Sequence, residues 1–554
     1  MSHACVGMLS RRGASIANMP TQAWDMAPGP QFSPRHIGMI SIFNDVIGPV
    51  MRGPSSSHCA AALRIGRLAR DLMDGRLEEA LVQFDAGGSL ATTHDSQGSD
   101  MGLFGGLLGW EADDERLPDS ARIIRESGVN VSIEIGQFDN PHPNTYRLTL
   151  KNADRRHSLK AVSTGGGIVE IIEIDGFTVS IAGDYRVTLI RTDGSGQAMV
   201  ERLAETLDAD EVLLHESNDR QLVEVRAGEF VDDAAIANLP GVDNIQFVRR
   251  LEPVLPVGSR RDMAVPFSTC EEMLRHDADK GTPLWRLAVE YESSRGEMSE
   301  DDVIARMTEI ARTARLSVEQ GIAGTEYDDR LLGHQCGTFK SRMEEGRLLG
   351  GGVLNRITLY VTALMEVKSS LGVIVACPTA GACGALPGAC LAVADEMDLS
   401  EQAVAKAMLA GGLIGAFIAT RSTFAAEVAG CQAECGSAAC MAAAALVTLA
   451  EGTTEQALAA ASMALQSSLG LICTPVANRV EVPCLGNNAV AAANGLTCAN
   501  MALADFDAVI PLDEVIATAD RVGRSLPREL RCTALAGLST TETSKQLERQ
   551  LKSS

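Results

Sequence analysis

Cysteine is the residue type in this sequence with the most specific chemistry to offer. The chain has 14 cysteines among 554 residues, most of them in alanine- and glycine-rich stretches after residue 370. Disulfide frameworks belong mainly to small secreted domains, so a chain of this length favours buried thiols or ligands for a metal or cluster. Thiols in small apolar runs are usually inert core residues. Five cysteines lie in such runs: Cys383, Cys390, Cys435, Cys440 and Cys498.

Four more cysteines lie where the chain is expected to leave regular helix, which is typical of thiolate ligands of a cluster. Cys473 and Cys484 each lie close to a proline in a predicted non-helical stretch. Cys431 follows a glycine, and Cys377 precedes a proline. Their spacing matches neither the Cys-x-x-Cys pairs of structural zinc sites nor the tight runs of ferredoxins. A cluster held by only three of them would leave one iron open as a Lewis acid.

Two polar segments in the N-terminal half could supply hydrogen-bonding or proton-transfer groups. Gly53-Pro54-Ser55-Ser56-Ser57-His58 comes before a predicted helix over 60–72, so its serines are expected to cap that helix. The free N–H groups of such a helix start could also hold a carboxylate. His142-Pro143-Asn144-Thr145 is expected to form a turn before a strand.

The elements that must position these residues change character along the chain. Residues 40–182 combine the helix over 60–72 with predicted strands at 131–135, 145–150 and 168–174. Residues 187–251 follow the order βαββαβ, which resembles an ACT domain, a module that often binds amino acids for regulation. From Cys270 onward the pattern is almost entirely helical, with glycine and proline between the helices.

We therefore expect a multidomain fold with an α+β N-terminal domain, a small ACT-like domain and an all-α C-terminal domain that carries the candidate cluster ligands. Residues 1–38 show no clear periodicity and are expected to be a disordered extension, or an overlong start before Met39. The expected boundaries are 39–182 for the α+β domain, 183–252 for the ACT-like domain, 253–267 for a proline-containing linker and 268–545 for the helical domain.

The charge and the apolar runs of the chain exclude several classes of partner. A net charge of −24 repels phosphate backbones and anionic membranes, so no nucleic acid or membrane partner is expected. The long uncharged runs are interrupted by prolines or asparagines, so none is predicted to span a bilayer. Without a convincing secretory signal, we expect a cytoplasmic protein.

Three segments around the candidate thiols resemble the cluster-ligand motifs of iron–sulfur-dependent L-serine dehydratases, in the family's order and spacing. They are Gly430-Cys431-Gln432-Ala433-Glu434, Cys473-Thr474-Pro475-Val476 and Val482-Pro483-Cys484. The family's Pro-Thr-Ala-Gly loop is present at 378–381, and 533–538 resembles its late Gly-Gly-Leu segment. The resemblance, which covers about 40–541, implies a 4Fe-4S cluster on Cys431, Cys473 and Cys484. It removes Cys377 from the candidate ligands.

The same resemblance implies roles for the polar segments. The serine-rich segment matches a signature of the family's β domain, which is thought to reach into the active-site cleft, and 142–144 matches a His-x-Asn element thought to line the substrate region. The implied catalytic candidates are His58, His142 and Asn144, and the substrate-binding candidates are Ser55, Ser56, Ser57 and Thr379. Lys340 and Lys368 are added by residue type, because a lysine can bind a carboxylate.

One segment departs from the family pattern. Where the family has Gly-His-Gly-Thr-Asp, this chain has Ser96-Gln97-Gly98-Ser99-Asp100. Glutamine cannot act as a base near neutral pH, so if that histidine removes the α-proton in relatives, another group must do so here. His94 is the candidate substitute.

The resemblance implies an L-serine ammonia-lyase that forms pyruvate and ammonia, in amino-acid catabolism or gluconeogenesis from serine. An open iron would assist loss of the hydroxyl group while a base takes the α-proton. Two alternatives stay open: a pyridoxal-phosphate serine or threonine dehydratase, for which no suitable lysine motif appears, and an amino-acid sensor of the same fold that has lost catalysis. A homodimer is expected. Some relatives end in a cysteine that reaches the cluster, whereas this chain ends Lys552-Ser553-Ser554.

Overall fold

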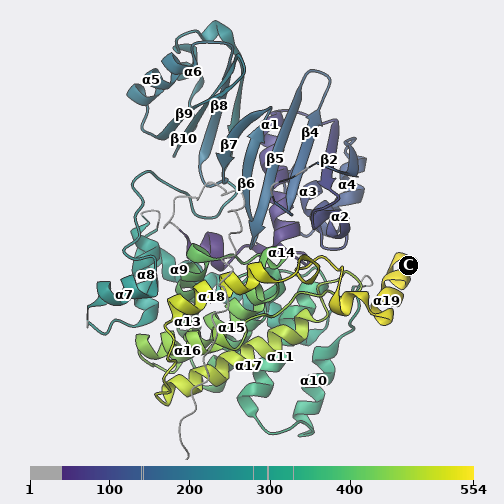
Figure 1. Ribbon diagram of the computed structural model, residues 1–554, viewed down its shortest axis with the longest axis vertical. Helices are drawn as coiled ribbons and strands as arrows, with labels where there is room; N and C mark the ends of the chain where they lie inside the picture. The colour runs from purple at the N-terminus through teal and green to yellow at the C-terminus, as the bar shows by residue number, and fades with distance from the viewer. Residues whose placement is uncertain are drawn as a thin grey trace, which may run out of the picture. The chain divides into compact units, whose positions relative to one another are not determined.

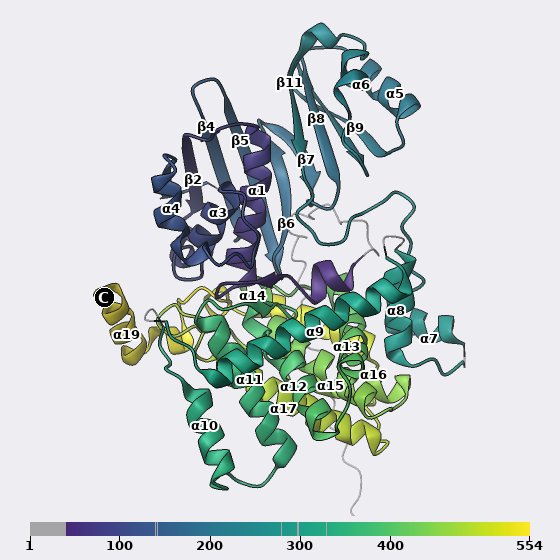
Figure 2. The same ribbon diagram turned by 180° about the vertical axis from the view of Figure 1, so that it is seen from behind.

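The computed structural model describes residues 40–138, 140, 142–278, 280–295, 298–327 and 330–553. The predicted extension over 1–38 lies outside these residues. Within them, all strands but one lie in the chain up to residue 251, and helices dominate after it, as Figures 1 and 2 show. The coarse prediction of a sheet-rich N-terminal region and a helical C-terminal region is therefore confirmed.

The N-terminal region is built on a six-stranded sheet in the order β3-β2-β4-β5-β6-β7. β2 and β3 run parallel and the other neighbours run antiparallel. The strands predicted at 131–135, 145–150 and 168–174 correspond to β3, β4 and β6. The bounds are β2 Glu79–Asp85, β3 Asn130–Gly136, β4 Thr145–Lys151, β5 Arg156–Gly165, β6 Ile168–Ile174 and β7 Phe177–Ile181.

Helix α1 packs on this sheet and matches the helix predicted over 60–72. Its buried apolar residues join those of β2, β4, β5 and β6 in one core. Helix α3 lies very close to α1, because a Cβ on Gly106 would stand only 2.0 Å from the carbonyl oxygen of Leu63. This tight pairing positions the loop that carries His94 and Gln97. The bounds are α1 Ala61–Met73, α2 Leu90–Thr93, α3 Ser99–Leu107 and α4 Ser120–Glu126.

Residues 186–251 form a separate four-stranded antiparallel sheet in the order β11-β8-β10-β9. The predicted order βαββαβ is observed, and a small apolar core lies between this sheet and helices α5 and α6. Its assignment as an ACT-like regulatory domain stays a prediction. The bounds are β8 Arg186–Thr192, α5 Gly196–Thr206, β9 Ala209–Ser217, β10 Arg220–Ala227, α6 Asp233–Ala237 and β11 Ile245–Leu251.

The C-terminal region packs its helices around α15, whose alanines are almost all fully buried. Small side chains let the neighbouring helices approach closely. One short strand, β12 (Ile374–Val375), pairs antiparallel with β1 (Val50–Met51), which the helical pattern did not predict. The helix bounds are α7 Cys270–Asp277, α8 Leu284–Ser294, α9 Glu300–Ala323, α10 Gln335–Glu344, α11 Gly352–Ser369, α12 Ala385–Glu396, α13 Glu401–Arg421, α14 Ala426–Ala429, α15 Ser437–Leu449, α16 Thr454–Gln466, α17 Cys484–Leu503, α18 Leu512–Ser525 and α19 Glu542–Ser553.

Two helical stretches, Glu401–Arg421 and Gln432–Leu449, are long and apolar enough to cross a membrane by length and composition. Their most apolar windows are 78% and 89% buried inside the protein. Burial of this extent is typical of core helices, which must be apolar on all sides.

Candidate active site

The three thiols predicted as cluster ligands lie together in the structure. The Cys431 thiol is within hydrogen-bonding contact of both Cys473 and Cys484. All three residues are buried, with 1%, 3% and 4% of their surface exposed. These contacts lower the pKa of the Cys431 thiol, because the neighbouring thiols hydrogen-bond its charged form. The site therefore favours a thiolate at its centre.

Each thiol is held by a different local structure. Cys431 follows Gly430, which has a φ of 73° and passes so close to Leu471 that a Cβ there would stand 2.9 Å from the Leu471 carbonyl oxygen. Cys473 lies in an irregular segment, as predicted. The prediction of a non-helical Cys484 is wrong, because this residue opens helix α17 directly after Pro483. Proline is well tolerated at a helix start. The hydrogen-bonding contact with the Cys431 thiol, together with burial, raises the pKa of the Cys484 thiol.

A fourth thiol, that of Cys532, lies in the same place and was missed from the sequence. The Cys473 thiol contacts it directly, and Cys532 is 4% exposed. The family resemblance covers the residues that follow, 533–538, but does not single out the cysteine before them. The thirteen cysteines in the described ranges are all free.

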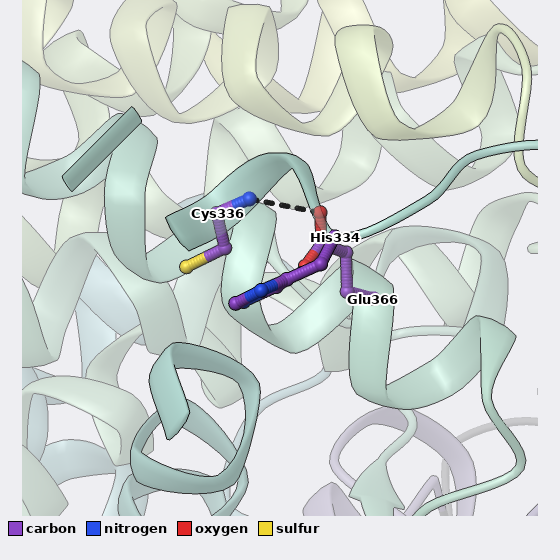
Figure 3. Close-up of side chains that lie close together, drawn as sticks. All are labelled: His334, Cys336 and Glu366. Atoms are coloured by element: carbon purple, nitrogen blue, oxygen red, sulfur yellow. Dashed lines mark hydrogen bonds and ion pairs between the residues drawn. The ribbon is translucent and has the colours of Figure 1, made fainter. Parts of the chain in front are cut away.

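Among the described residues, only the thiol of Cys336 belongs to a tight group with two other types of metal-binding side chain. Its ligand atom and those of His334 and Glu366 all lie within 4.8 Å of one another (Figure 3). The Glu366 carboxylate already accepts the backbone N–H groups of Gln335 and Cys336 at 2.5 and 3.0 Å, and the His334 ring lies 3.1 Å from the Gly321 carbonyl. These bonds secure the start of α10, so capping accounts for this group.

The thiols of Cys431, Cys473 and Cys484 are not all within 4.8 Å of one another, although Cys431 contacts each of the other two. A single tetrahedral zinc, with Zn–S bonds of about 2.3 Å, would need its sulfurs within roughly 4 Å of one another. A cluster binds each thiolate through a different iron and accepts a wider spacing. A buried all-sulfur donor set of this kind therefore fits an iron–sulfur cluster.

His58 lies at the centre of a buried hydrogen-bond network. Its Nδ1 is 3.0 Å from Ser55 Oγ and its Nε2 is 2.8 Å from Thr93 Oγ1. The Thr93 hydroxyl donates to the Ser89 carbonyl, so it accepts from His58 Nε2–H. Burial lowers the pKa of His58, although the nearby negative charge of Glu427 acts in the opposite direction. The lowered pKa keeps the imidazole neutral.

The serines before α1 do not cap it, contrary to the prediction. A π-helical turn, Ser56–Ala60, leads into α1, and the residue at its N-cap position is Ala60. The serine side chains point to other partners: the Ser57 hydroxyl donates to Glu427 at 2.8 Å, and Ser56 Oγ accepts the N–H of Ala380 at 3.1 Å. Bonds to the distant helical half have replaced the local capping that the sequence suggested.

Glu427 connects the N-terminal polar groups to the thiols and was not identified from the sequence. It lies in the short helix α14, four residues before Cys431, and its carboxylate is 3.5 Å from His58 Nδ1. Its charge acts on both His142 and Cys532. Its sequence neighbours are alanines and a valine, so no local pattern marked it.

His142 and Asn144 form a second polar pair. The backbone N–H of Asn144 donates to His142 Nδ1 at 3.1 Å, and burial lowers the pKa of His142 to about 4. Asn144 is fully buried, and its side-chain oxygen accepts a hydrogen bond from Ser89. Its amide nitrogen Nδ2 has no hydrogen-bond partner among the described residues. A buried donor without a partner is costly and suggests an absent ligand.

His94 has the geometry of an oriented base. Its Nδ1 lies 2.8 Å from Asp100 Oδ2. Burial alone would lower the pKa of His94, but the hydrogen bond and charge of Asp100 outweigh it and raise this pKa. His94 lines an open pocket of about 930 Å³, together with Asn478, Arg479 and Thr533. Gln97, in contrast, is buried, and its amide lies 4.0 Å from Cys532 Sγ.

Thr379 belongs to the same site, whereas Lys340 does not. The Thr379 hydroxyl donates to Glu434 at 2.7 Å, and burial, with the adjacent Cys484, raises the pKa of Glu434 to about 8. Lys368 is fully buried close to Glu434 and Cys484, and it donates to the Val480 carbonyl at 2.5 Å. Lys340 lies on α10 with 45% of its side chain exposed, paired with Glu344.

Comparison with known proteins gives one family. A profile of the serine dehydratase alpha chain matches residues 279–539. The probable L-serine dehydratase alpha chain of Bacillus subtilis is 32% identical over 285 residues, which are 51% of this chain and 95% of that one. The probable beta chain of the same organism is 31% identical over 217 residues, 38% of this chain and 97% of that one. The L-serine dehydratase of Streptomyces coelicolor is 27% identical over 504 residues, 88% of this chain and 96% of that one. The chain therefore belongs to the L-serine dehydratase family of carbon–nitrogen lyases, in a single-chain form.

Proposed function

We propose that this protein converts L-serine to pyruvate and ammonia, with Cys431, Cys473 and Cys484 holding a 4Fe-4S cluster. The observation that carries the proposal is the contact of three buried thiols from separate segments beside a cluster of buried histidines and carboxylates. When bound, the cluster supplies a Lewis acid that lowers the barrier to loss of the serine hydroxyl group. The enamine that remains tautomerises to an imine, which water hydrolyses to pyruvate and ammonia without further catalysis.

We assign the role of general base to His94. It would substitute for the family's histidine, whose position Gln97 occupies in this chain. Asp100 accepts the Nδ1 proton of His94, which leaves Nε2 to take the α-proton of serine. His94 is partly exposed and lines the open pocket, so substrate can reach it. His58 is less suited, because both of its ring nitrogens already have partners.

The other polar groups bind and orient the substrate in this proposal. The unpaired amide of Asn144 donates to an oxygen of serine, and neutral His142 lies beside it. His58, held by Ser55 and Thr93, keeps the Ser57–Glu427 pair in place. Burial of these groups excludes water and strengthens each of their interactions.

The buried positive charge of Lys368, in the C-terminal helical region, offsets the negative charge of the thiolates. Lys368 lies close enough to Cys484 and Glu434 to favour the charged forms of both. Thr379 orients Glu434 through its hydroxyl. Thr379 and Lys368 thus act on the groups around the cluster, and Lys340, on the exposed face of α10, has no part in the proposed site.

The test is an assay of pyruvate formation from L-serine by protein purified without oxygen, together with its visible spectrum. We expect turnover and a broad iron–sulfur absorbance. A sensor that had lost catalysis would form no pyruvate. A discrete imine band at full activity would instead identify a pyridoxal-phosphate enzyme.

We further propose that residues 186–251 form an ACT-like regulatory module and that the protein is a cytoplasmic homodimer. The four-stranded sheet of residues 186–251 has β11 and β9 as its edge strands within the described residues. An edge strand can pair with the edge strand of a second copy. Free thiols throughout the described ranges fit a reducing compartment. The reaction would serve amino-acid catabolism or gluconeogenesis from serine.

A further inference from the structure

We propose that Cys532 is a fourth thiolate ligand of the cluster and covers the iron that L-serine must reach. This inference rests on the cluster assigned in the proposed function. It makes the substrate displace a ligand that the chain itself supplies. Three observations carry it: the backbone pairing of Cys532, the contacts of its sulfur, and its position toward the N-terminal polar groups.

The backbone ties Cys532 to a predicted ligand. The N–H of Cys473 donates to the Leu530 carbonyl at 2.9 Å, and the N–H of Cys532 donates back to the Cys473 carbonyl at 3.4 Å. These bonds belong to a short parallel bridge between Cys473 and Arg531. The two cysteines are thus held side by side by main-chain bonds.

The sulfur of Cys532 belongs to the thiol group. Ala426, Cys431, Cys473 and Cys532 form one buried cluster, and the Cys473 thiol is in hydrogen-bonding contact with those of both Cys431 and Cys532. Cys473 therefore lies between a predicted ligand on one side and Cys532 on the other. The thiols of Cys484, Cys431, Cys473 and Cys532 thus form one continuous group, which could supply one thiolate to each iron of a single cluster.

Cys532 also lies on the side where the open iron is needed. The Gln97 amide stands 4.0 Å from its sulfur, and the charges of Glu427 and Glu434 act on it. The three predicted ligands come from the helical half, whereas Gln97 belongs to the loop that carries His94. Cys532 thus contacts both a predicted ligand and the loop that carries the proposed base.

The backbone of Cys532 is unusual for a residue that only packs. Its φ is 49°, in the left-handed region, and Ala534 has a φ of 58°. Residues other than glycine are uncommon there, and such strain gathers at functional sites. A cysteine kept in this conformation, with its sulfur against another thiol, is consistent with a ligand held in place by the surrounding structure.

Displacement of Cys532 needs no oxidant or reductant. The bond between its sulfur and the iron breaks, a bond from an oxygen of serine to that iron forms, and the freed thiolate takes a proton from solvent. The Gln97 amide is placed to hydrogen-bond the freed sulfur. Gln97, which cannot act as a base, would then hydrogen-bond the sulfur of Cys532 rather than the substrate.

Mössbauer spectroscopy tests this on the complete protein, purified without oxygen and enriched in the Mössbauer-active iron isotope. Without serine, the wild-type cluster should have all of its irons in sulfur coordination. L-serine, or the substitution Cys532→Ala, should convert one iron to a site with a distinct signal. The matched control is Cys498→Ala, a buried thiol on α17 that bonds only Asn494 among the contacts described, and its spectrum should equal that of the wild type.

The wild-type spectrum alone decides the question if Cys532→Ala does not fold. A distinct iron already present without serine, or a Cys532→Ala spectrum equal to that of the wild type, would overturn the fourth ligand and leave the proposed function intact. Protein with no iron–sulfur signal at all would overturn the proposed function and this inference with it. Chemical oxidation gives a second readout, because a fully thiolate-bound cluster should lose an iron only after serine is added.

Discussion

His94 combines the two features that a general base requires, a partner that orients it and a face that substrate can reach. The Nδ1–H group of His94 donates to Asp100 Oδ2 at an N–O distance of 2.8 Å, and the ring lines the pocket beside Asn478 and Arg479. The sequence offered His94 only as a neighbour of Gln97. The ion pair with Asp100, six residues later, gives the assignment its physical basis.

The substitution Asp100→Asn should move the acid limb of the pH–rate profile to lower pH. Asp100 raises the pKa of His94, so its removal lets that pKa fall, and the neutral base is then present at lower pH. Activity at the optimum should also fall, because the ring loses its orientation. Steady-state kinetics between pH 5 and 9 measure both effects.

The histidine itself supplies the control for this prediction. His94→Gln should lower kcat by about 100-fold to 10,000-fold, as loss of a general base does, with little change in the melting temperature. An acid limb that stays in place in Asp100→Asn, or near-normal turnover in His94→Gln, would assign the base to another group.

The unpaired amide of Asn144 gives a second test at this scale. Asn144→Leu removes the buried donor while keeping a similar volume, so the KM for L-serine should rise by roughly 10-fold to 100-fold, the worth of a hydrogen bond to a charged group. The free energy of unfolding should change little. A large loss of stability with an unchanged KM would show that Asn144 has only a structural role.

At the scale of elements, periodicity predicted most of the fold because each element buries one apolar face. Strands β3, β4 and β6 and helix α1 begin and end within a residue of where the pattern placed them. The errors occurred where a distant partner overrides a local preference. Ser56 and Ser57 bond groups more than 300 residues away instead of capping α1. Glu427 and Cys532 were missed for the same reason, since only the folded chain brings them to the ligands.

The loop that carries Thr379 should tolerate no side chain at Gly381. A Cβ there would stand 2.6 Å from a carboxylate oxygen of Glu434, so Gly381→Ala must displace that buried group. We expect a loss of about 1–3 kcal/mol in the free energy of unfolding and weaker cluster retention, measured by denaturant unfolding and by iron content.

Gly486→Ala is the matched control, because this residue lies on α17 two positions after Cys484 with nothing within 4 Å of its Cβ position. It should be neutral or stabilise the protein by about 0.5–1 kcal/mol, since alanine favours helix over glycine. Equal losses in the two variants would contradict the proposed close contact between Gly381 and Glu434.

At the scale of the whole molecule, the site joins segments from both halves of the chain. Ser57 donates to Glu427, Ala380 donates to Ser56, and Asn478 donates to the Thr92 carbonyl. A cluster bound to this folded arrangement must also stabilise it, because the unfolded chain has no preformed site.

Removal of iron by a chelator should therefore lower the melting temperature of the wild-type protein. The shift should be several degrees, since binding energy is lost from the folded state alone. In Cys473→Ala, which we expect to lack the cluster, the chelator should change nothing. Equal melting temperatures for wild-type protein with and without iron would contradict a cluster that is built into the fold.

The most direct test of the cluster assignment is the iron and acid-labile sulfide content of protein purified without oxygen. We predict about four of each per wild-type chain, as a 4Fe-4S cluster requires, and about the same for Cys498→Ala. Cys431→Ala, Cys473→Ala and Cys484→Ala should each lose most of both, along with pyruvate formation. Full iron, sulfide and activity in any one of these three variants would contradict the assignment of that thiol as a ligand.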